Sequence, residues 1–179
     1  YGAKVGDLDA ATSLSGASYL LEGKAMNDVG FGLIARNYSR FINQIDANQT
    51  SVGWWRVGPT DQPYGRYARG FEHASGRDRM YFDLDDKFFP PSVKGSLALK
   101  LIYLDQGTGK FSVRYASATD PDKIAITVTK TNSGRWVEKS VSIPDASFAN
   151  QGPKSSDFSL VNEDEEDDIF HMIEITKSN

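Results

Sequence analysis

The second half of the chain alternates between apolar and polar residues in short runs, a pattern typical of β-strands with one buried face. From residue 79 onward, β-branched and aromatic residues recur at every second position, and turn-forming residues separate the runs. The pattern predicts strands at 79–84, 97–104, 111–115, 123–131, 135–143, 157–161 and 169–175. Weaker strand patterns precede them at 38–45 and 52–57, and a long polar, aromatic loop is predicted between 57 and 79.

Turn signals separate these strands at regular intervals. Residues 105–110 (Asp-Gln-Gly-Thr-Gly-Lys) and 132–134 (Asn-Ser-Gly) are typical of hairpin turns that use glycine at positive φ. The prolines in 88–91 and 143–145 should end strands, because proline cannot donate to a β-ladder. No window of ten residues keeps a helical apolar stripe, so a parallel α/β fold is excluded. The sequence therefore predicts an all-β protein, an antiparallel β-sandwich of the jelly-roll kind.

The chain has 179 residues, close to the size of one domain. Residues 1–30 are rich in Gly, Ala, Ser and Asp, and we interpret them as a linker or an N-terminal extension packing on the domain. Residues 31–179 are predicted to form a single β-sandwich.

Composition narrows the classes of function. The chain has no cysteine, which excludes disulfides, thiolate metal sites and cysteine nucleophiles. Its net charge of −4 argues against general binding of nucleic acid. No apolar run is long enough to span a membrane and no signal peptide opens the chain, so we expect a soluble piece of a longer precursor.

The stretch 94–175 resembles the galactose-binding-like β-sandwiches. Three runs carry the resemblance, at 99–115, at 130–136 (Lys-Thr-Asn-Ser-Gly-Arg-Trp) and at 167–175 (Asp-Asp-Ile-Phe-His-Met-Ile-Glu-Ile). Such sandwiches serve as carbohydrate-binding modules of secreted bacterial enzymes that degrade polysaccharides. The resemblance implies a sugar-binding protein that binds a glycan on a concave face or loop edge, with a structural calcium ion far from the sugar. It also implies a covalently linked catalytic domain in the precursor and a secreted or cell-surface location.

The segment from 54 to 79 combines aromatic rings with five arginines. Aromatic rings stack on the apolar faces of sugars, and the arginine fork forms paired hydrogen bonds with carboxylate or sulfate. This combination predicts binding of an acidic or sulfated polysaccharide or oligosaccharide. The candidate ligand-binding residues are Trp54, Trp55, Arg56, Tyr64, Arg66, Tyr67, Arg69 and His73.

The same residues have ordinary structural interpretations. Tryptophan and tyrosine in a sandwich are more often core residues than sugar platforms. Adjacent strand residues point to opposite faces, so we expect only one of Trp54 and Trp55 to be exposed. The arginines can instead pair with nearby acids to pin the loop, and the candidate partners are Asp61, Glu72, Asp78 and Asp83.

Acidic residues are concentrated at 162–168 and at Asp83, Asp85 and Asp86, and carboxylate oxygens are the ligands that calcium prefers. The candidate calcium ligands are Asp164, Asp167 and Asp168, together with a distant N-terminal segment. The alternative is a solvated turn before the last strand. No cofactor besides this structural calcium is expected.

An enzyme needs a selected nucleophile and base, or a pair of carboxylates across a cleft, and no motif selects either. We therefore expect a non-catalytic module. One alternative is a β-jelly-roll polysaccharide lyase that uses Tyr64, Tyr67, His73 and Tyr81. Another is a structural spacer or docking sandwich without a ligand, and in that case the rings and arginines of 54–79 would not form an exposed surface. His171 lies in an apolar strand and is expected to be a core or edge residue.

Overall fold

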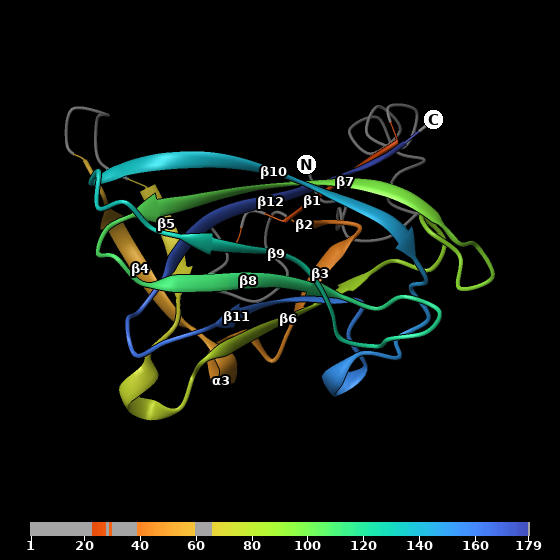
Figure 1. Ribbon diagram of the computed structural model, residues 1–179, viewed down its shortest axis with the longest axis horizontal. Coiled ribbons are helices and arrows are strands. Elements are labelled where there is room, and N and C mark those ends of the chain that lie inside the picture. The colour runs from red at the N-terminus through yellow and green to blue at the C-terminus, as the bar shows by residue number, and fades with distance from the viewer. Residues whose placement is uncertain (1–22, 28, 30–38, 60–65, 179) are drawn as a thin grey trace, which may run out of the picture.

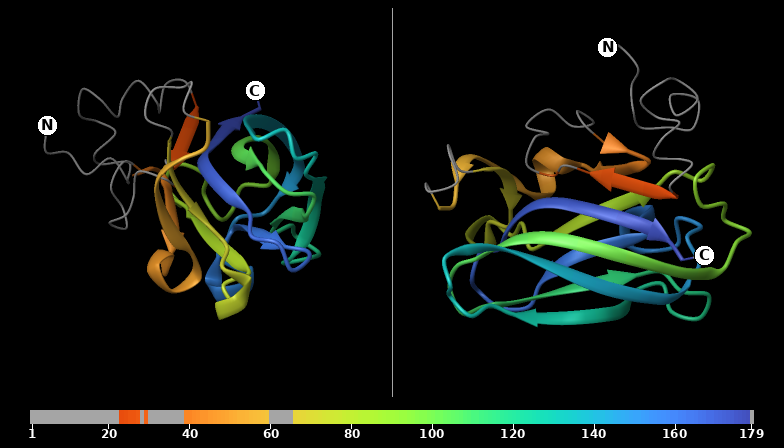
Figure 2. Two further views of the ribbon diagram at one scale, coloured as in Figure 1. Left: turned by 90° about the vertical axis from the view of Figure 1, so that its left-hand side faces the viewer. Right: turned by 90° about the horizontal axis from the view of Figure 1, so that it is seen from above.

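The protein is a sandwich of two antiparallel β-sheets, which confirms the fold class predicted from the sequence (Figures 1 and 2). The computed structural model describes residues 23–27, 29, 39–59 and 66–178, apart from the side chain of Trp55. In the described part, no helix is long and apolar enough to cross a membrane.

The larger sheet forms the upper layer in Figure 1 and has seven strands, in the order β10-β7-β12-β1-β2. Strand β5 pairs with the first residues of β12, and β4 pairs with β5. The bounds are β1 Lys24–Asn27, β2 Ser39–Arg40, β4 Val52–Val57, β5 Arg66–Gly70, β7 Gly95–Asp105, β10 Arg135–Ala146 and β12 Ile169–Lys177.

The smaller sheet has five strands in the order β3-β6-β11-β8-β9. The bounds are β3 Ile42–Ile45, β6 Arg79–Leu84, β8 Lys110–Tyr115, β9 Lys123–Thr129 and β11 Phe158–Asn162. The described helical turns are short, namely α3 Ala47–Thr50, η1 His73–Ser75 and η2 Pro153–Ser155.

The core lies between the sheets and is built from the inward-facing residues of each strand. On β6 the residues Met80, Phe82 and Leu84 are fully buried, and they alternate with half-buried neighbours as the period of two requires. Aromatic rings fill the space between the layers, and the Phe111 and Phe170 rings meet edge to face with centroids 5.0 Å apart. This packing fixes the sheets on which the surface side chains stand.

Most predicted strands are confirmed, and two strands were missed. The structure has β4 and β6 at the predicted bounds. The strand predicted at 38–45 is instead two strands in different sheets, β2 and β3, and the ends of the remaining strands differ by a few residues. The first missed strand is β1, which pairs with β12 from Lys24 opposite Thr176 to Asn27 opposite Ile173. Part of the segment interpreted as a linker or an N-terminal extension packing on the domain, residues 24–27, is therefore a strand of the larger sheet.

The second missed strand is β5, which lies in the segment predicted as loop. Strand β10 also continues past its predicted end, because pairing with β7 shifts after Ile143 and resumes at Ala146 opposite Gly95. Pro144 sits in this irregularity on the outermost strand of the described sheet, a position where a missing N–H is tolerated.

Candidate functional site

The β4–β5 hairpin carries most of the residues that the sequence singled out. Trp54 lies opposite Ala68, and the register between the two strands shifts between Trp54 and Val57. Trp54 is 41% exposed although it stands next to the fully buried Ala68. Arg56 is exposed and has a left-handed φ of 56° within this irregular stretch. The hairpin therefore presents an aromatic ring and a guanidinium group at the surface.

Arg66 at the start of β5 lies over a tryptophan from a distant part of the chain. Its guanidinium carbon is 5.4 Å from the centre of the Trp136 ring, which belongs to β10. The Trp136 ring also lies 5.8 Å from the His171 ring, and His171 Nδ1 is 2.8 Å from the carbonyl oxygen of Tyr67. Strands β5, β10 and β12 thus meet at one cluster of rings.

Gly58, which follows β4, lies very close to the Trp136 ring. A Cβ added at Gly58 would stand 2.4 Å from Trp136 Nε1, and Gly58 has a φ of 94°. Within the described residues, Trp136 Nε1 is buried and has no hydrogen-bond partner. Burying a hydrogen-bond donor without an acceptor costs free energy. The packing of the hairpin against the ring must offset this cost.

Arg69 was predicted to contact the ligand, but the structure places it inside the protein. It is 2% exposed, and its guanidinium donates to the Ala47 carbonyl at 2.9 Å, to Asn48 Oδ1 at 3.0 Å and to Ser51 Oγ at 2.8 Å. These bonds tie β5 to α3. We therefore leave Arg69 out of the candidate site.

His73 lies beyond the opposite end of β5 from Arg66, on η1 (the yellow turn at the bottom of Figure 1). Its Nδ1 is 2.9 Å from Asp78 Oδ1, and its backbone N–H donates to Asp167 Oδ1 at 2.7 Å. The hydrogen bond to Asp78 raises the pKa of His73, and the charges of Asp78, Glu165 and Asp167 raise it further. These acidic surroundings disfavour an anionic ligand, so His73 does not extend the Arg66 surface.

The remaining candidates are half-buried, paired with acidic residues or outside the described residues. Tyr67 is half-buried, Tyr64 lies outside the described residues, and of Trp55 only the backbone is described. Arg77 pairs with Glu72, as the loop-pinning alternative predicted for that arginine, while Arg79 pairs with Asp122. Tyr67 and Tyr81 stand on different sheets, so the described structure does not assemble the residues of the lyase alternative.

The acidic turn is held by donors from its own protein. Asp164 accepts the backbone N–H groups of Lys110 and Glu166, the latter at 2.8 Å. Glu166 accepts those of Thr108 and Gly109, at 2.9 and 2.8 Å. These bonds fasten the turn to the β7–β8 hairpin.

One of the predicted calcium ligands is already paired within the protein. Asp168 is 1% exposed, and its Oδ1 lies 2.8 Å from the ammonium nitrogen of the equally buried Lys130, a group that repels a cation. Burial raises the pKa of Asp168 to about 6, against the lowering effect of Lys130. No group of three or more metal-ligating side chains occurs among the described residues. The contact with Lys130 disfavours calcium at Asp168, whereas calcium binding by Asp164 and Asp167 with a distant N-terminal segment stays a prediction.

Trp136 and His171 complete the cluster under Arg66, but sequence reasoning did not assign them to the site. Trp136 entered only as part of a scaffold hairpin, and His171 only as a core or edge histidine. Both side chains are half-buried, and His171 stands at the register shift between Phe170 and Met172 on β12, which is an interior strand, so it is neither a core nor an edge residue. Their role depends on which strands lie side by side, and no local signal in the sequence gives that information.

No protein-family model matches this chain, and no curated protein matches it. Among solved structures, similar ones include the K1 cleaved adhesin domain of Lys-gingipain from Porphyromonas gingivalis W83, with 12% identity over 87% of this chain and 99% of that chain and a TM-score of 0.44. Another is the carbohydrate-binding module CBM6cm-2 from Cellvibrio mixtus lichenase 5A in complex with cellotriose (13% identity, 73% and 88% covered, TM-score 0.34). A third is the CBM22-1–GH10 part of Clostridium thermocellum xylanase 10B complexed with xylohexaose (17%, 78% and 26%, TM-score 0.43). Structural neighbours of this chain thus include carbohydrate-binding modules and adhesin domains, at a similarity that leaves its ligand open.

Proposed function

We propose that this chain is a non-catalytic carbohydrate-binding module that recognises an acidic or sulfated polysaccharide through its β4–β5 hairpin. The binding residues are Trp54, Arg56 and Arg66, with Trp136 beneath Arg66, and we call them the hairpin surface. The observation that carries the proposal is the exposed Trp54 ring on the same hairpin as the stacked Arg66.

The strand geometry supports the proposal that the Trp54 ring and the Arg66 guanidinium lie on the same face of the hairpin. Trp54 is paired with Ala68, so the two side chains share one face of the hairpin, and Arg66 lies two residues from Ala68 on the same strand. The Trp54 ring extends toward Gly70, where an added Cβ would stand 3.3 Å from Trp54 Nε1, so a chain of several sugar units is needed to contact both groups. The ring offers stacking to a sugar face, and the guanidinium offers charge-assisted hydrogen bonds to an anionic substituent of the glycan.

Trp136 is expected to orient Arg66 for this task. A guanidinium stacked on an indole loses part of its conformational freedom before the ligand arrives, and the aromatic face stabilises its charge. A preorganised arginine therefore needs less ordering on binding than one that moves freely in solvent.

The wider role follows from the family resemblance of residues 94–175. We propose that the chain attaches a covalently linked catalytic domain to its polysaccharide outside the bacterial cell. A spacer without a ligand is the competing role, and it differs in having no affinity for glycans.

The experiment is calorimetry and affinity electrophoresis of the protein against a panel of neutral, uronate-containing and sulfated polysaccharides. We expect binding to charged members of the panel, and we expect it to weaken as salt is raised because Arg56 is exposed and Arg66 only half-buried. Binding to none of the charged glycans would contradict the proposal and favour the spacer. Release of shortened products from any of them would favour the lyase.

A further inference from the structure

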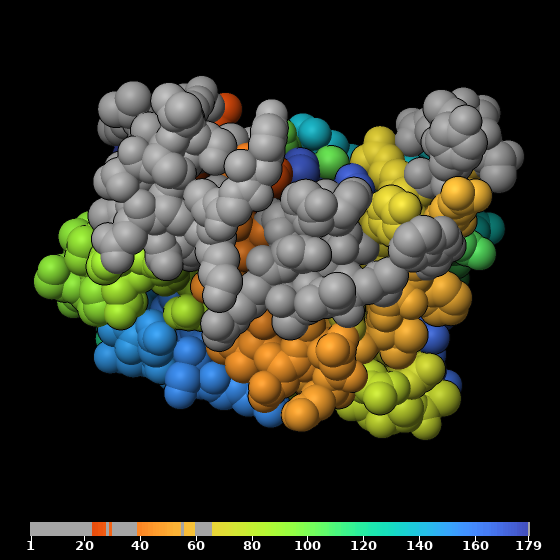
Figure 3. Space-filling view, turned by 180° about the vertical axis from the view of Figure 1, so that it is seen from behind, coloured from red at the N-terminus to blue at the C-terminus, as the bar shows by residue number. Residues whose placement is uncertain are grey.

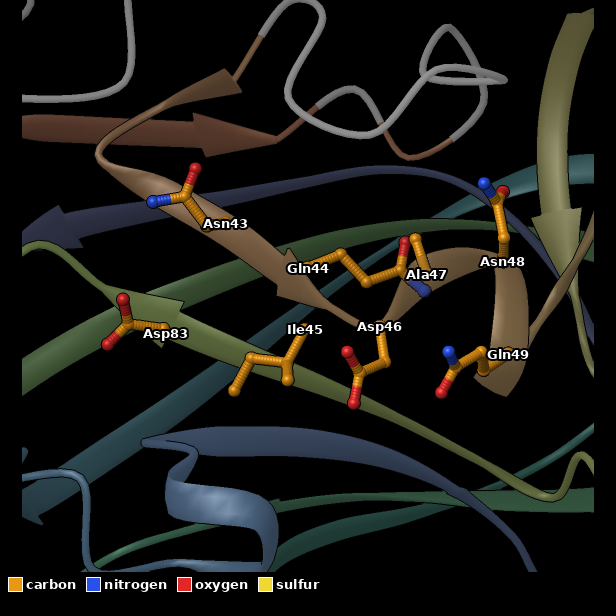
Figure 4. Close-up of a pocket in the computed structure, with 8 residues that line it drawn as sticks. All are labelled: Asn43, Gln44, Ile45, Asp46, Ala47, Asn48, Gln49 and Asp83. Atoms are coloured by element: carbon orange, nitrogen blue, oxygen red, sulfur yellow. The ribbon is translucent and has the colours of Figure 1, made fainter.

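An open pocket of about 410 Å³ lies at the β3 edge of the five-stranded sheet, away from the Arg66–Trp136 pair. Its volume falls within the range of small-molecule sites. The residues that line it come from β3, from α3 with the residue preceding it, and from β6, and they are Asn43, Gln44, Ile45, Asp46, Ala47, Asn48, Gln49 and Asp83 (Figure 4).

The backbone at the end of β3 creates the shape of this pocket. Asp46 has a left-handed φ of 48°, and this conformation turns the chain from β3 into α3. Figure 4 shows the side chains of Ile45, Asp46 and Gln49 extending from one side of this turn, with Asp83 on the neighbouring strand. In the ladder, Asp83 lies opposite Asn43, so the pairing of β3 with β6 fixes the position of Asp83 in the pocket wall.

Internal contacts hold the polar groups in place. Lys154 Nζ lies 3.3 Å from Asp46 Oδ2, and Asn150 Nδ2 donates to Asp83 Oδ1 at 3.2 Å. The buried Arg69 fixes the α3 turn through the Ala47 carbonyl and Asn48 Oδ1. Side chains that are already oriented lose little entropy when a ligand binds, which is a property of built sites.

The chemistry of the lining selects the class of ligand. Two carboxylates and four carboxamides offer many acceptors and several donors, and the eight lining residues themselves include no cationic side chain, although Lys154 pairs with Asp46 from outside the lining. Hydroxyl groups match such a surface because each can donate and accept, whereas an anionic group would meet two carboxylates beside the Lys154 ammonium. Ile45 adds an apolar contact for the C–H face of a ring.

We propose that this pocket binds an uncharged, hydroxyl-rich sugar residue, as a site separate from the hairpin surface. The two sites then have opposite charge preferences within one small domain. The proposal does not depend on the hairpin surface, because binding at each site is measured through the residues of that site.

Nitrogen-15 NMR of the side-chain amides tests the pocket directly, since Asn43, Gln44, Asn48 and Gln49 each give an NH₂ signal. The probes are methyl β-glucoside, cellotriose and methyl β-glucuronide, of which the first and last share a ring and differ in one carboxylate. We expect the neutral probes to shift the pocket amides in a saturable manner, and the glucuronide to shift them at least several-fold less at equal concentration. Unshifted pocket amides with both neutral probes, or equal shifts with the glucuronide, would overturn the proposal.

Matched variants separate the pocket from unspecific surface effects. Gln49→Ala should weaken the neutral-sugar titration at the Asn43, Gln44 and Asn48 amides about tenfold or more, whereas Gln106→Ala, in the exposed turn after β7, should leave it unchanged. Equal effects of the two variants would contradict a specific site. Binding of acidic glycans followed through Arg66→Ala reports on the hairpin surface alone, so failure at one site is distinguishable from failure at the other.

Discussion

Arg66 and Trp136 are 70 positions apart in the sequence, yet the guanidinium carbon of one lies 5.4 Å from the ring centre of the other. The contact exists because β5 joins the sheet that contains β10, and Gly58, just after β4, packs against Trp136 (Figure 3 shows β4 and β5 from behind, in orange to yellow). It gives the half-buried Arg66 a fixed platform.

Replacing Arg66 should show whether a charged glycan binds at a specific site or is attracted by surface charge in general. Arg66→Ala is expected to weaken binding of a charged glycan about tenfold, because a charge-assisted hydrogen bond is lost. Lys100→Ala removes an equal charge from a lysine that lies near Glu138 and Glu174 on the sheet, and it should change affinity little. Calorimetry at two salt concentrations measures both variants. Equal losses would point to unspecific attraction.

Gly58 should tolerate no side chain. Gly58→Ala places a Cβ 2.4 Å from Trp136 Nε1 at a φ of 94°, which adds a clash to a strained backbone. We expect the free energy of unfolding to fall by about 1–2 kcal/mol or more, and glycan affinity to fall with it as Arg66 loses its platform. Gly134→Ala, also at positive φ (70°) but with open space around it, is the control for backbone strain alone. A Gly58→Ala variant no less stable than Gly134→Ala would show that the hairpin tip is not closed on the ring.

Arg69 should be a determinant of stability and not of hairpin binding. Arg69→Met leaves the buried Ser51 carbonyl without its guanidinium donor and removes one of the donors to the Ala47 carbonyl, so we expect a loss of about 2–4 kcal/mol in urea unfolding. Affinity for charged glycans, measured where the variant is folded, should be unchanged. Unchanged stability with lost affinity would return Arg69 to the ligand site.

Asp157 should make stability fall as pH rises. Burial raises its pKa from 3.8 to about 7, despite the backbone hydrogen bonds from Leu84 and Asn150. Between pH 4 and 7 the folded state therefore holds a proton that the unfolded state has released, and stability decreases through this window. Asp168 acts in the same direction up to about pH 6.

Urea unfolding at several pH values measures this slope. Asp157→Asn should flatten it, because the amide does not titrate, whereas Glu138→Gln at an exposed position should retain it. A slope that Asp157→Asn leaves unaltered would place the titration elsewhere.

Calcium should leave the melting temperature unchanged unless the N-terminal segment adds ligands to Asp164 and Asp167. The acids of the 162–168 turn already accept internal hydrogen bonds, and Asp168 faces the Lys130 ammonium. Thermal unfolding with added calcium and with a chelator checks this expectation. A rise of the melting temperature that a chelator reverses would show that a segment outside the described residues completes a site.

The sequence predicted the scaffold well because strands with one buried face leave a local signal. The run 79–84 alternates so cleanly that its bounds match β6, with Met80, Phe82 and Leu84 facing inward. Strand β5 (Arg-Tyr-Ala-Arg-Gly) has no such alternation, and it forms because β4 and β12 supply its partners. Strand β1 is short and follows a segment without periodicity, so only its pairing with β12 reveals it.

The candidate site was harder to predict because charged side chains are exposed in most cases but not in all. Arg56 is exposed as expected, but Arg69 is buried because an adjacent turn offers carbonyl and hydroxyl acceptors for its whole guanidinium. Trp54 is exposed, and the prediction that only one of the two adjacent tryptophans is exposed stays a prediction, because the Trp55 side chain lies outside the described residues. Trp136 could not be assigned to this site from sequence, since a contact between β5 and β10 side chains is a property of the finished sheet.

The pairing of β1 with β12 has a consequence for how the protein is made. Lys24 meets Thr176, so the first and last described strands of the chain complete the middle of the larger sheet together. Such long-range closure is entropically costly and slow. During synthesis, the strand at Lys24–Asn27 must wait, without its partner, until Ile169–Lys177 has left the ribosome. The β8–β9 hairpin and the β7–β10 pair can form before that moment, whereas the larger sheet closes only as one of the last events of folding.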